Sequence, residues 1–192
     1  MEANRQSEVL QDRVGASAGE AAAEKPEGPL AREIEAYAGE AADQLPIGGY
    51  ATMIGAFVGS FATLVIAARA AGTLPERVPV SDIALLGVAT HKLTRIVSRE
   101  RVAIPLRVPF THYEGTDGAG QVKEEPRGRG VQRAIGSLVT CQYCTGPWIA
   151  TVLTAGLLFA PRVTRLASSL FAMVAVSDFL HQAYAFARRG SG

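Results

Sequence analysis

Cysteine is scarce in this chain of 192 residues, and Cys141 and Cys144 are the only two. A second Cys-x-x-Cys is therefore absent, and two thiolates alone cannot complete the four-ligand site that zinc requires. Familiar enzyme motifs are also missing, because the chain contains no Walker loop, Gly-x-Ser-x-Gly, His-Glu-x-x-His or Rossmann fingerprint. These absences favour a structural or accessory protein over an enzyme.

The chain has little net charge, +1 overall, but its charges are unevenly divided. Residues 1–46 carry ten acidic and four basic side chains, whereas the remainder carries eight acidic and fifteen basic ones. The first segment is rich in Ala, Glu and Gly and cannot bury enough apolar surface to offset the entropy of ordering. We expect a disordered acidic N-terminal tail over 1–46, within which Pro29–Asp43 is suited to a short helix.

Long uncharged runs are abundant, and they define the class of protein. Ile47–Ala68 has 22 residues without a charge, Ala134–Pro161 has 28, and Leu166–Ala187 has 22 with one carboxylate. A helix of about 20 residues crosses a hydrocarbon core of roughly 30 Å. We therefore expect an all-α integral membrane protein. The first run begins only after 46 polar residues, which is typical of an uncleaved anchor rather than a signal peptide.

About four transmembrane helices are expected, as a small bundle of two helical hairpins. The predicted spans are 47–68, 78–97, 138–160 and 166–187, followed by a short C-terminal tail over 188–192. The second span is the least apolar, because it carries Asp82, His91, Lys92 and Arg95. A re-entrant or interfacial helix is the alternative for that segment.

The segment 98–137 is the main loop, and it sets the expected orientation. No strand alternation persists in it, and its last residues, "GVQRAIGSLVT", are typical of a helix that leads into the third span. Nine Lys and Arg residues lie between Lys92 and Arg133, so the positive-inside rule predicts a cytoplasmic loop and cytoplasmic termini. Several glutamates interrupt this basic segment, which argues against a nucleic-acid surface.

A ridge of small side chains follows the first span, where Ala51, Gly55, Gly59 and Thr63 recur every four residues. Such ridges let helix backbones approach closely in lipid. The pattern is more typical of packing against the protein's own spans than of a homo-oligomer or a contact with another membrane protein. The lipid bilayer is the remaining expected partner.

The cysteine pair lies at the cytoplasmic mouth of the third span and permits three interpretations. Zinc is the first, if His91 and His181, at compatible depths, supply the missing ligands. Thiol redox is the second, with one cysteine attacking and the other resolving. The third is a pair of small buried residues without a chemical role, which the sequence favours. A permanent disulfide is not expected on the cytosolic side, where thiols are kept reduced.

Asp178 falls near the middle of the fourth span, where a carboxylate is costly unless it is paired, protonated or hydrated. We expect a structural tie to His181, to His91, or to a basic group of the second span such as Arg95. A proton relay or a substrate contact is the alternative. Asp82 lies nearer the outer face, where water reaches it more easily.

These residues resemble a known family. "ATHKLTRIVSRERVAIPLRVPFTHYEG", "EEPRGRG", "LVTCQYCTGPWIA" and "VSDFLH" are similar to an uncharacterised bacterial membrane family, domain of unknown function 1360 (DUF1360), over roughly residues 78–187. The resemblance implies a small multi-span protein of the bacterial cytoplasmic membrane and supplies no activity. The thiol-redox or zinc-binding membrane protein therefore stays open as the alternative to a structural or accessory role.

Overall fold

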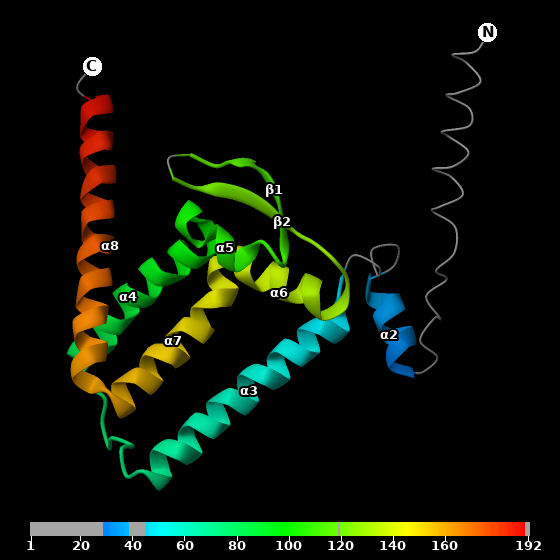
Figure 1. The fold of residues 1–192 in the computed structure, drawn as a ribbon, viewed down its shortest axis with the longest axis horizontal. Helices are drawn as coiled ribbons and strands as arrows, with labels where there is room; N and C mark the ends of the chain where they lie inside the picture. The colour runs from blue at the N-terminus through cyan, green and yellow to red at the C-terminus, as the bar shows by residue number, and fades with distance from the viewer. Residues whose placement is uncertain (1–28, 39–44, 119, 191–192) are drawn as a thin grey trace. The chain divides into compact units, whose positions relative to one another are not determined.

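The structure is a computed structural model that describes residues 29–38, 45–118 and 120–190 (Figure 1). The chain divides into two compact units, Met1–Leu45 and Pro46–Gly192. Within the first unit the structure describes one helix, α2 (Pro29–Ala38), where the sequence predicted a short helix. Residues 1–28 and 39–44 of the predicted acidic tail lie outside the described residues.

The second unit is mostly helical, as predicted, and each predicted span corresponds to one long helix. Its elements are α3 (Ile47–Ala70), α4 (Val80–Arg99), η2 (Arg101–Ala103), α5 (Ile104–Arg107), β1 (Thr111–Thr116), β2 (Val122–Pro126), α6 (Gly130–Thr140), α7 (Gln142–Phe159) and α8 (Pro161–Gly190). By length and composition, α3 and α8 could cross a membrane. No other described helix passes the same test, so four transmembrane helices are not established.

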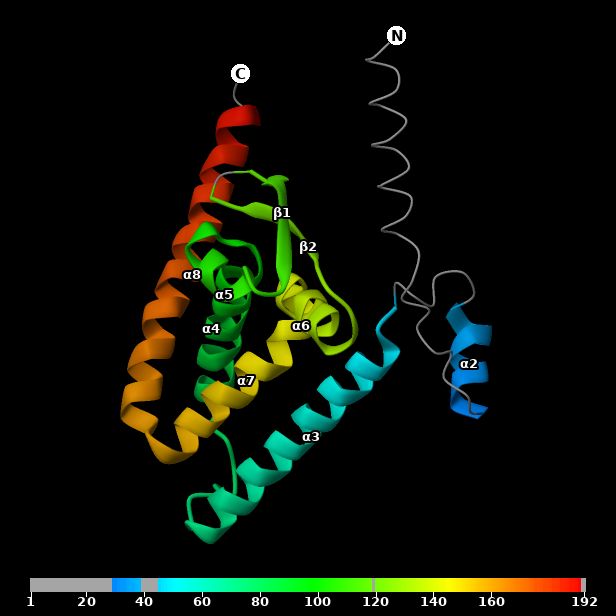
Figure 2. The ribbon, with the colours of Figure 1, turned by 45° about the vertical axis from the view of Figure 1, so that its right-hand side comes forward.

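The helix α4 lies at the centre of this unit, packed against α7 and α8 (Figure 2). The helix α7 leads directly into α8, and the two contact each other at the position of the predicted second hairpin. The predicted first hairpin is different, because α3 packs mainly on α6 and the start of α7 rather than on α4. Gly49 permits the packing of α3 on α6, since a Cβ at this position would lie 2.7 Å from Ala134 Cβ and from the Gly130 carbonyl oxygen. Only glycine allows α3 to approach α6 so closely.

A β-hairpin in the main loop corrects the expectation that this segment lacks strands. The strands β1 and β2 pair antiparallel from Thr111 opposite Pro126 to Thr116 opposite Val122, with a register shift between Tyr113 and Gly115. This shift interrupts the alternation of inward and outward side chains, which hides the strands from pattern analysis. The turn uses Gly118 and Gly120, whose φ angles of 89° and 76° suit glycine.

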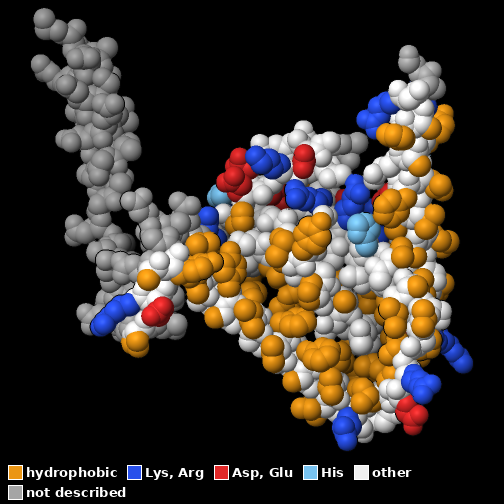
Figure 3. Space-filling model, turned by 180° about the vertical axis from the view of Figure 1, so that it is seen from behind, with side chains coloured by type: hydrophobic (Ala, Val, Ile, Leu, Met, Phe, Trp, Pro, Cys, Tyr) orange, Lys and Arg blue, Asp and Glu red, His pale blue; other side chains and the backbone are white. Residues whose placement is uncertain are grey.

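The surface of this unit separates charged from apolar side chains. Figure 3 shows Lys, Arg, Asp and Glu gathered near the hairpin and at the opposite helix ends, with hydrophobic side chains over the helices between them. Exposed large hydrophobic residues on α3 include Ile54, Val58 and Phe61, and those on α8 include Leu166, Phe179 and Leu180. A contiguous apolar surface of this kind marks a membrane or protein contact.

The ridge of small residues on α3 does not pack against the other helices of the described chain. Its four members are exposed. A Cβ added at Gly55 or Gly59 meets nothing within 4 Å. The described structure therefore offers no internal partner for the ridge, and a contact outside the chain stays a prediction.

Candidate functional site: the cysteine pair between α6 and α7

The cysteines lie at a break between two helices. Cys141 ends α6 and precedes α7 with an extended backbone, φ −104° and ψ 107°. Local side chains satisfy the backbone groups that the break exposes. Thr145 Oγ1 donates to the carbonyl oxygens of Leu138, at 2.8 Å, and Cys141, at 3.1 Å. Cys141 Sγ accepts the backbone N–H of Cys144 at 3.2 Å and so acts as the N-cap of α7.

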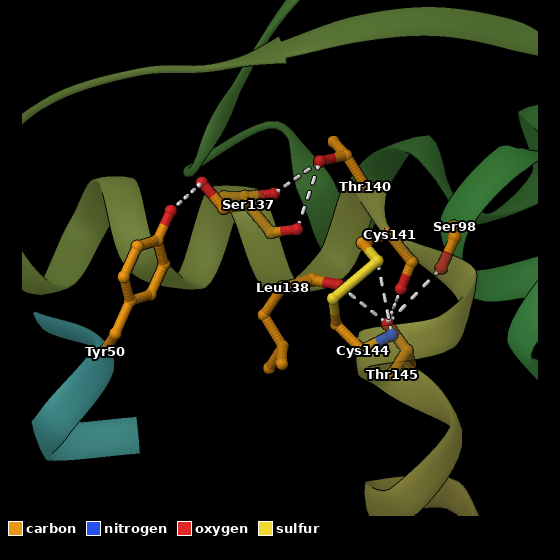
Figure 4. The surroundings of a disulfide bond; sticks show 9 residues. Tyr50, Ser98, Ser137, Leu138, Thr140, Cys141, Cys144 and Thr145 are labelled. Atoms are coloured by element: carbon orange, nitrogen blue, oxygen red, sulfur yellow. Dashed lines mark hydrogen bonds between the residues drawn. A yellow bond between two sulfur atoms is a disulfide. The ribbon is translucent and has the colours of Figure 1, made fainter. Parts of the chain in front are cut away.

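The two sulfur atoms are joined as a disulfide (Figure 4). The Cα atoms of the two cysteines are 5.2 Å apart, within the ordinary range for a disulfide. The sequence argues only against a permanent disulfide on the cytosolic side, so a bond that forms and breaks is compatible with the redox interpretation. Cys144 is exposed and Cys141 is half-buried, so the pair is not the fully buried one that the sequence favoured.

A polar contact holds the start of α7 to α4. Ser98 Oγ and Thr145 Oγ1 are 3.3 Å apart, and both residues are buried. Thr145 also donates to the carbonyl oxygens at the break between α6 and α7. Its contact with Ser98 therefore holds the cysteine pair against α4, the central helix.

Neither histidine proposed for a zinc site lies with the cysteines in a metal-binding group. His91 is exposed on α4, and its ring stacks on Phe179 with centroids 5.8 Å apart. His181 is exposed on α8. Across the described residues, no group of three or more His, Cys, Asp or Glu side chains could hold a metal ion. The zinc interpretation gains no support.

An apolar groove of about 360 Å³ adjoins the cysteine pair. We call it the Trp148 groove, and its lining residues are Tyr50, Met53, Ile54, Phe57, Leu138, Cys144, Pro147 and Trp148. Phe57 and Trp148 meet edge to face, with ring centroids 5.4 Å apart. Tyr50 Oη donates a long hydrogen bond, 3.4 Å, to Ser137 Oγ (Figure 4). The exposed cysteine thus borders a hydrophobic, aromatic site.

Asp178 is tied to the second predicted span through Lys92. Its Oδ2 accepts from Lys92 Nζ at 2.9 Å, and the same ammonium also donates to Glu100. The Lys92 side chain is only 7% exposed, so the cation is the buried member of the group. Among the described contacts, the partner of Asp178 is Lys92 rather than His181 or the half-buried Arg95.

Arg107 is a buried structural anchor that sequence reasoning missed. Its side chain is fully buried and donates to the carboxylate of Glu124 in β2. It also donates to the carbonyl oxygens of Val97, at 2.6 Å, and Glu100, at 3.2 Å. Arginine is rarely buried without such partners. A lone Arg within the apolar stretch "IPLRVPF" was the available signal. The guanidinium fastens the hairpin to the end of α4.

Asp82 is buried, contrary to the expectation that water would reach it easily. Arg165, at the start of α8, donates to both carboxylate oxygens, Nε to Oδ1 at 2.9 Å and Nη2 to Oδ2 at 2.7 Å. Such bidentate pairs combine strength with fixed geometry. The pair borders an apolar cavity of about 470 Å³ between α4 and α7.

These features define a mostly helical protein with two helices apolar enough to cross a membrane, paired charges between α4 and α8, and a close cysteine pair at a helix break. The chain belongs to the family described as protein of unknown function (DUF1360), which matches residues 85–184. The resemblance drawn from the sequence is thereby confirmed. The match begins within α4 and ends within α8, so it includes the cysteines and excludes α3.

One curated relative is the "Sporulation protein YjcA" of Bacillus subtilis (strain 168), which is 35% identical over 74 residues. The matched region covers 37% of this chain and 63% of that protein, so the chain spans somewhat less than two thirds of its relative. No solved structure matches the chain significantly.

Proposed function

We propose that this protein is a multi-pass protein of the bacterial cytoplasmic membrane that carries out thiol–disulfide exchange at Cys141 and Cys144. The observation that carries the proposal is the arrangement of the pair. One cysteine is exposed, and the sulfur of the other accepts a backbone N–H at the start of an 18-residue helix. This geometry favours redox chemistry over the structural or accessory role that the sequence alone favoured.

The two sulfurs have different tasks in the exchange. An incoming thiolate attacks Cys144 Sγ, because Cys144 is the more exposed cysteine, and the S–S bond breaks toward Cys141. The electron pair remains on Cys141 Sγ, where the N–H of Cys144 and the helix N-terminus stabilise negative charge. A second thiolate of the substrate then attacks the mixed disulfide and releases Cys144. The substrate leaves oxidised, and this protein is left as a dithiol.

The proposed orientation agrees with such a role. With α3, α4, α7 and α8 as four spans, segment 98–137, both termini and the cysteines face the cytoplasm. Disulfides on that side are usually transient and belong to catalysis or redox sensing. We infer that the pair cycles rather than serving as a permanent brace.

Paired charges support the insertion of the less apolar helices. An unpaired charge within a bilayer is costly, and charges that face each other inside a bundle lower that cost. Lys92 with Asp178 and Asp82 with Arg165 join α4 to α8 in this way. The lipid bilayer would then surround the exposed apolar side chains. The small-residue ridge of α3 is left for a second copy or another membrane protein, and no nucleic-acid partner is proposed.

Trapping in cells tests the exchange. Thiols are blocked by acid quenching and alkylation, and the redox state is read from a mass shift. We expect wild type to contain both dithiol and disulfide. In Cys141→Ser, Cys144 can still attack an oxidised substrate in the reverse of the exchange, and the mixed disulfide should accumulate because Cys141 is not there to displace the substrate. Cys144→Ser should accumulate much less. A wild type that stays fully reduced after mild oxidant treatment, with no adduct on Cys141→Ser, contradicts the proposal.

Labelling tests the orientation independently. A single cysteine placed at Gly118 in a variant without Cys141 and Cys144 should react with an impermeant maleimide only after the membrane is opened. Gly118 is exposed in the hairpin turn, so the label can reach it once the reagent is on the correct side. Labelling of intact cells would reverse the assigned topology.

A further inference from the structure

We propose that the Trp148 groove binds the ring of a membrane quinone, which accepts two electrons when the Cys141–Cys144 dithiol closes to the disulfide. The inference rests on the proposed thiol exchange and names the oxidant that renews the disulfide. It begins from the position of Cys144, which is both the exposed cysteine and one of the residues that line the groove.

The chemistry of the groove selects the class of oxidant. None of its eight lining residues carries a charge, and three of them are aromatic. A phosphate-bearing cofactor or a charged peptide thiol would find no ionic partner there, whereas a flat apolar ring can stack against Phe57 and Trp148. The volume of about 360 Å³ is at the lower end of the range for small-ligand sites, which suits a single ring.

One polar group in the groove can orient the ring. The Tyr50 hydroxyl bonds Ser137 at 3.4 Å, a long distance for an O–H···O bond. Rotation of this O–H would let it donate to a quinone oxygen instead and orient the ring beside Cys144. Tyr50 lies on α3, one of the two helices apolar enough to cross a membrane, so a carrier dissolved in the bilayer has direct access.

The electrons and protons of this reaction balance between the two cysteines and the quinone. The Cys144 thiolate adds to the quinone ring, and the Cys141 thiolate attacks Cys144 Sγ. The S–S bond forms as the bond between sulfur and the ring breaks, and the electron pair of that bond stays on the ring. The two protons released by the thiols end on the two ring oxygens. One dithiol and one quinone thus become one disulfide and one hydroquinone.

The test uses the purified full chain in detergent, reduced and freed of reductant, with ubiquinone-1 as the probe. Its fully substituted ring has no C–H position, so thiols cannot form a stable aromatic thioether with it, and a transient adduct can only revert or be displaced by a second thiol. We expect one hydroquinone per chain, formed at a rate that saturates with quinone concentration, together with loss of both thiols. Trp148→Leu should slow the reaction at low quinone about tenfold, the size expected when an aromatic contact and its buried area are lost. Tyr50→Phe should slow it less.

Matched controls separate the groove from the rest of the protein. Met173→Ala alters a different apolar groove, between α4 and α8, and should react like wild type. Diamide, a small water-soluble oxidant, should close the disulfide at equal rates in all variants. A thermal melt in detergent reports separately whether Trp148→Leu is folded. If that variant fails to fold, Tyr50→Phe, which keeps the ring in place, decides the question.

The outcomes distinguish the two proposals. Two results would overturn the quinone site and leave thiol exchange standing. The first is that diamide closes the disulfide and ubiquinone-1 does not. The second is that the rate with ubiquinone-1 does not saturate and is equal in wild type, Trp148→Leu and Tyr50→Phe. Failure of both oxidants to close the disulfide overturns thiol exchange itself.

Discussion

The helices α3 and α4 are both predicted spans, yet the more apolar of the two is the less buried. Over its 24 residues α3 buries only Gly49 and Ala68. The helix α4 is shorter, 20 residues, and carries more polar groups. Its buried residues are Asp82, Ala89, Lys92, Thr94 and Ser98.

This contrast shows that hydropathy reports the surroundings of a helix rather than its importance to the fold. A helix that faces lipid needs apolar side chains around its circumference, whereas a central helix can carry polar groups where neighbours supply partners. The family match agrees with this division, because it contains most of α4 and none of α3. The specific interactions of the bundle therefore concentrate on α4 and the elements attached to its ends.

The largest effect should come from Arg107, which fastens the hairpin to α4. Arg107→Met leaves the nearly buried Glu124 carboxylate and the Val97 carbonyl without their donor. Breaking a buried ion pair in this way costs about 3–5 kcal/mol. We expect a large drop in the melting temperature measured in detergent.

Two further variants control this experiment. Exposed Arg101 follows the end of α4, and Arg101→Met should change stability by less than about 0.5 kcal/mol. A double variant, Arg107→Met with Glu124→Leu, should recover part of the loss because no charge is left unpaired. Equal melting of Arg107→Met and wild type would show that the hairpin does not depend on this anchor.

Lys92 should come next, because it joins α4 to α8. Lys92→Met removes the donor of both Asp178 and Glu100, whose side chains are 35% and 25% exposed, so water compensates in part. We expect a loss of about 2 kcal/mol in thermal melts, a smaller loss for Asp178→Leu and the smallest for Asp178→Asn. His181→Ala is the matched control on α8 and should melt like wild type.

This series also separates the structural tie from a proton relay. If Lys92→Met and Asp178→Leu both melt like wild type, the tie contributes no stability. The relay considered for Asp178 then becomes the better explanation of a carboxylate at that position.

The glycines of α3 test the contrast between its two faces, and the smallest effect should come from Gly55. Gly49→Ala places a methyl group 2.7 Å from Ala134 Cβ, so we expect a loss of about 1–3 kcal/mol from overpacking. Gly55→Ala meets no neighbour, and helix propensity should stabilise it by up to about 1 kcal/mol.

Crosslinking then tests the ridge itself. If the exposed small residues bind a second copy, Gly55→Leu should reduce dimer crosslinking in membranes, while Phe61→Leu, an exposed position of the same helix away from the ridge, leaves it intact. Equal crosslinking of both variants would assign this face to lipid or to a different partner.

Local pattern made much of the fold predictable. The four long helices and α6 were found from apolar runs and helix-forming composition, and their bounds differ from the expected ones by only a few residues. The hairpin was missed because its strands are short and the register shift near Gly115 breaks their alternation. The cysteine pair was identified from its spacing, but the Trp148 groove combines residues of α3, α6 and α7 that no local pattern connects.

The sequence by itself determined the helices, the scarcity of cysteine and the family, since these depend on neighbouring residues and on motif order. The tertiary structure alone decided which polar side chains meet. Asp82 and Arg165 are 83 residues apart, Lys92 and Asp178 are 86 apart, and Tyr50 and Ser137 are 87 apart. The residues next to a charged side chain in the sequence do not indicate which distant residue it will pair with. Its partner is set by how the helices pack, and that packing depends on close approaches such as the one at Gly49.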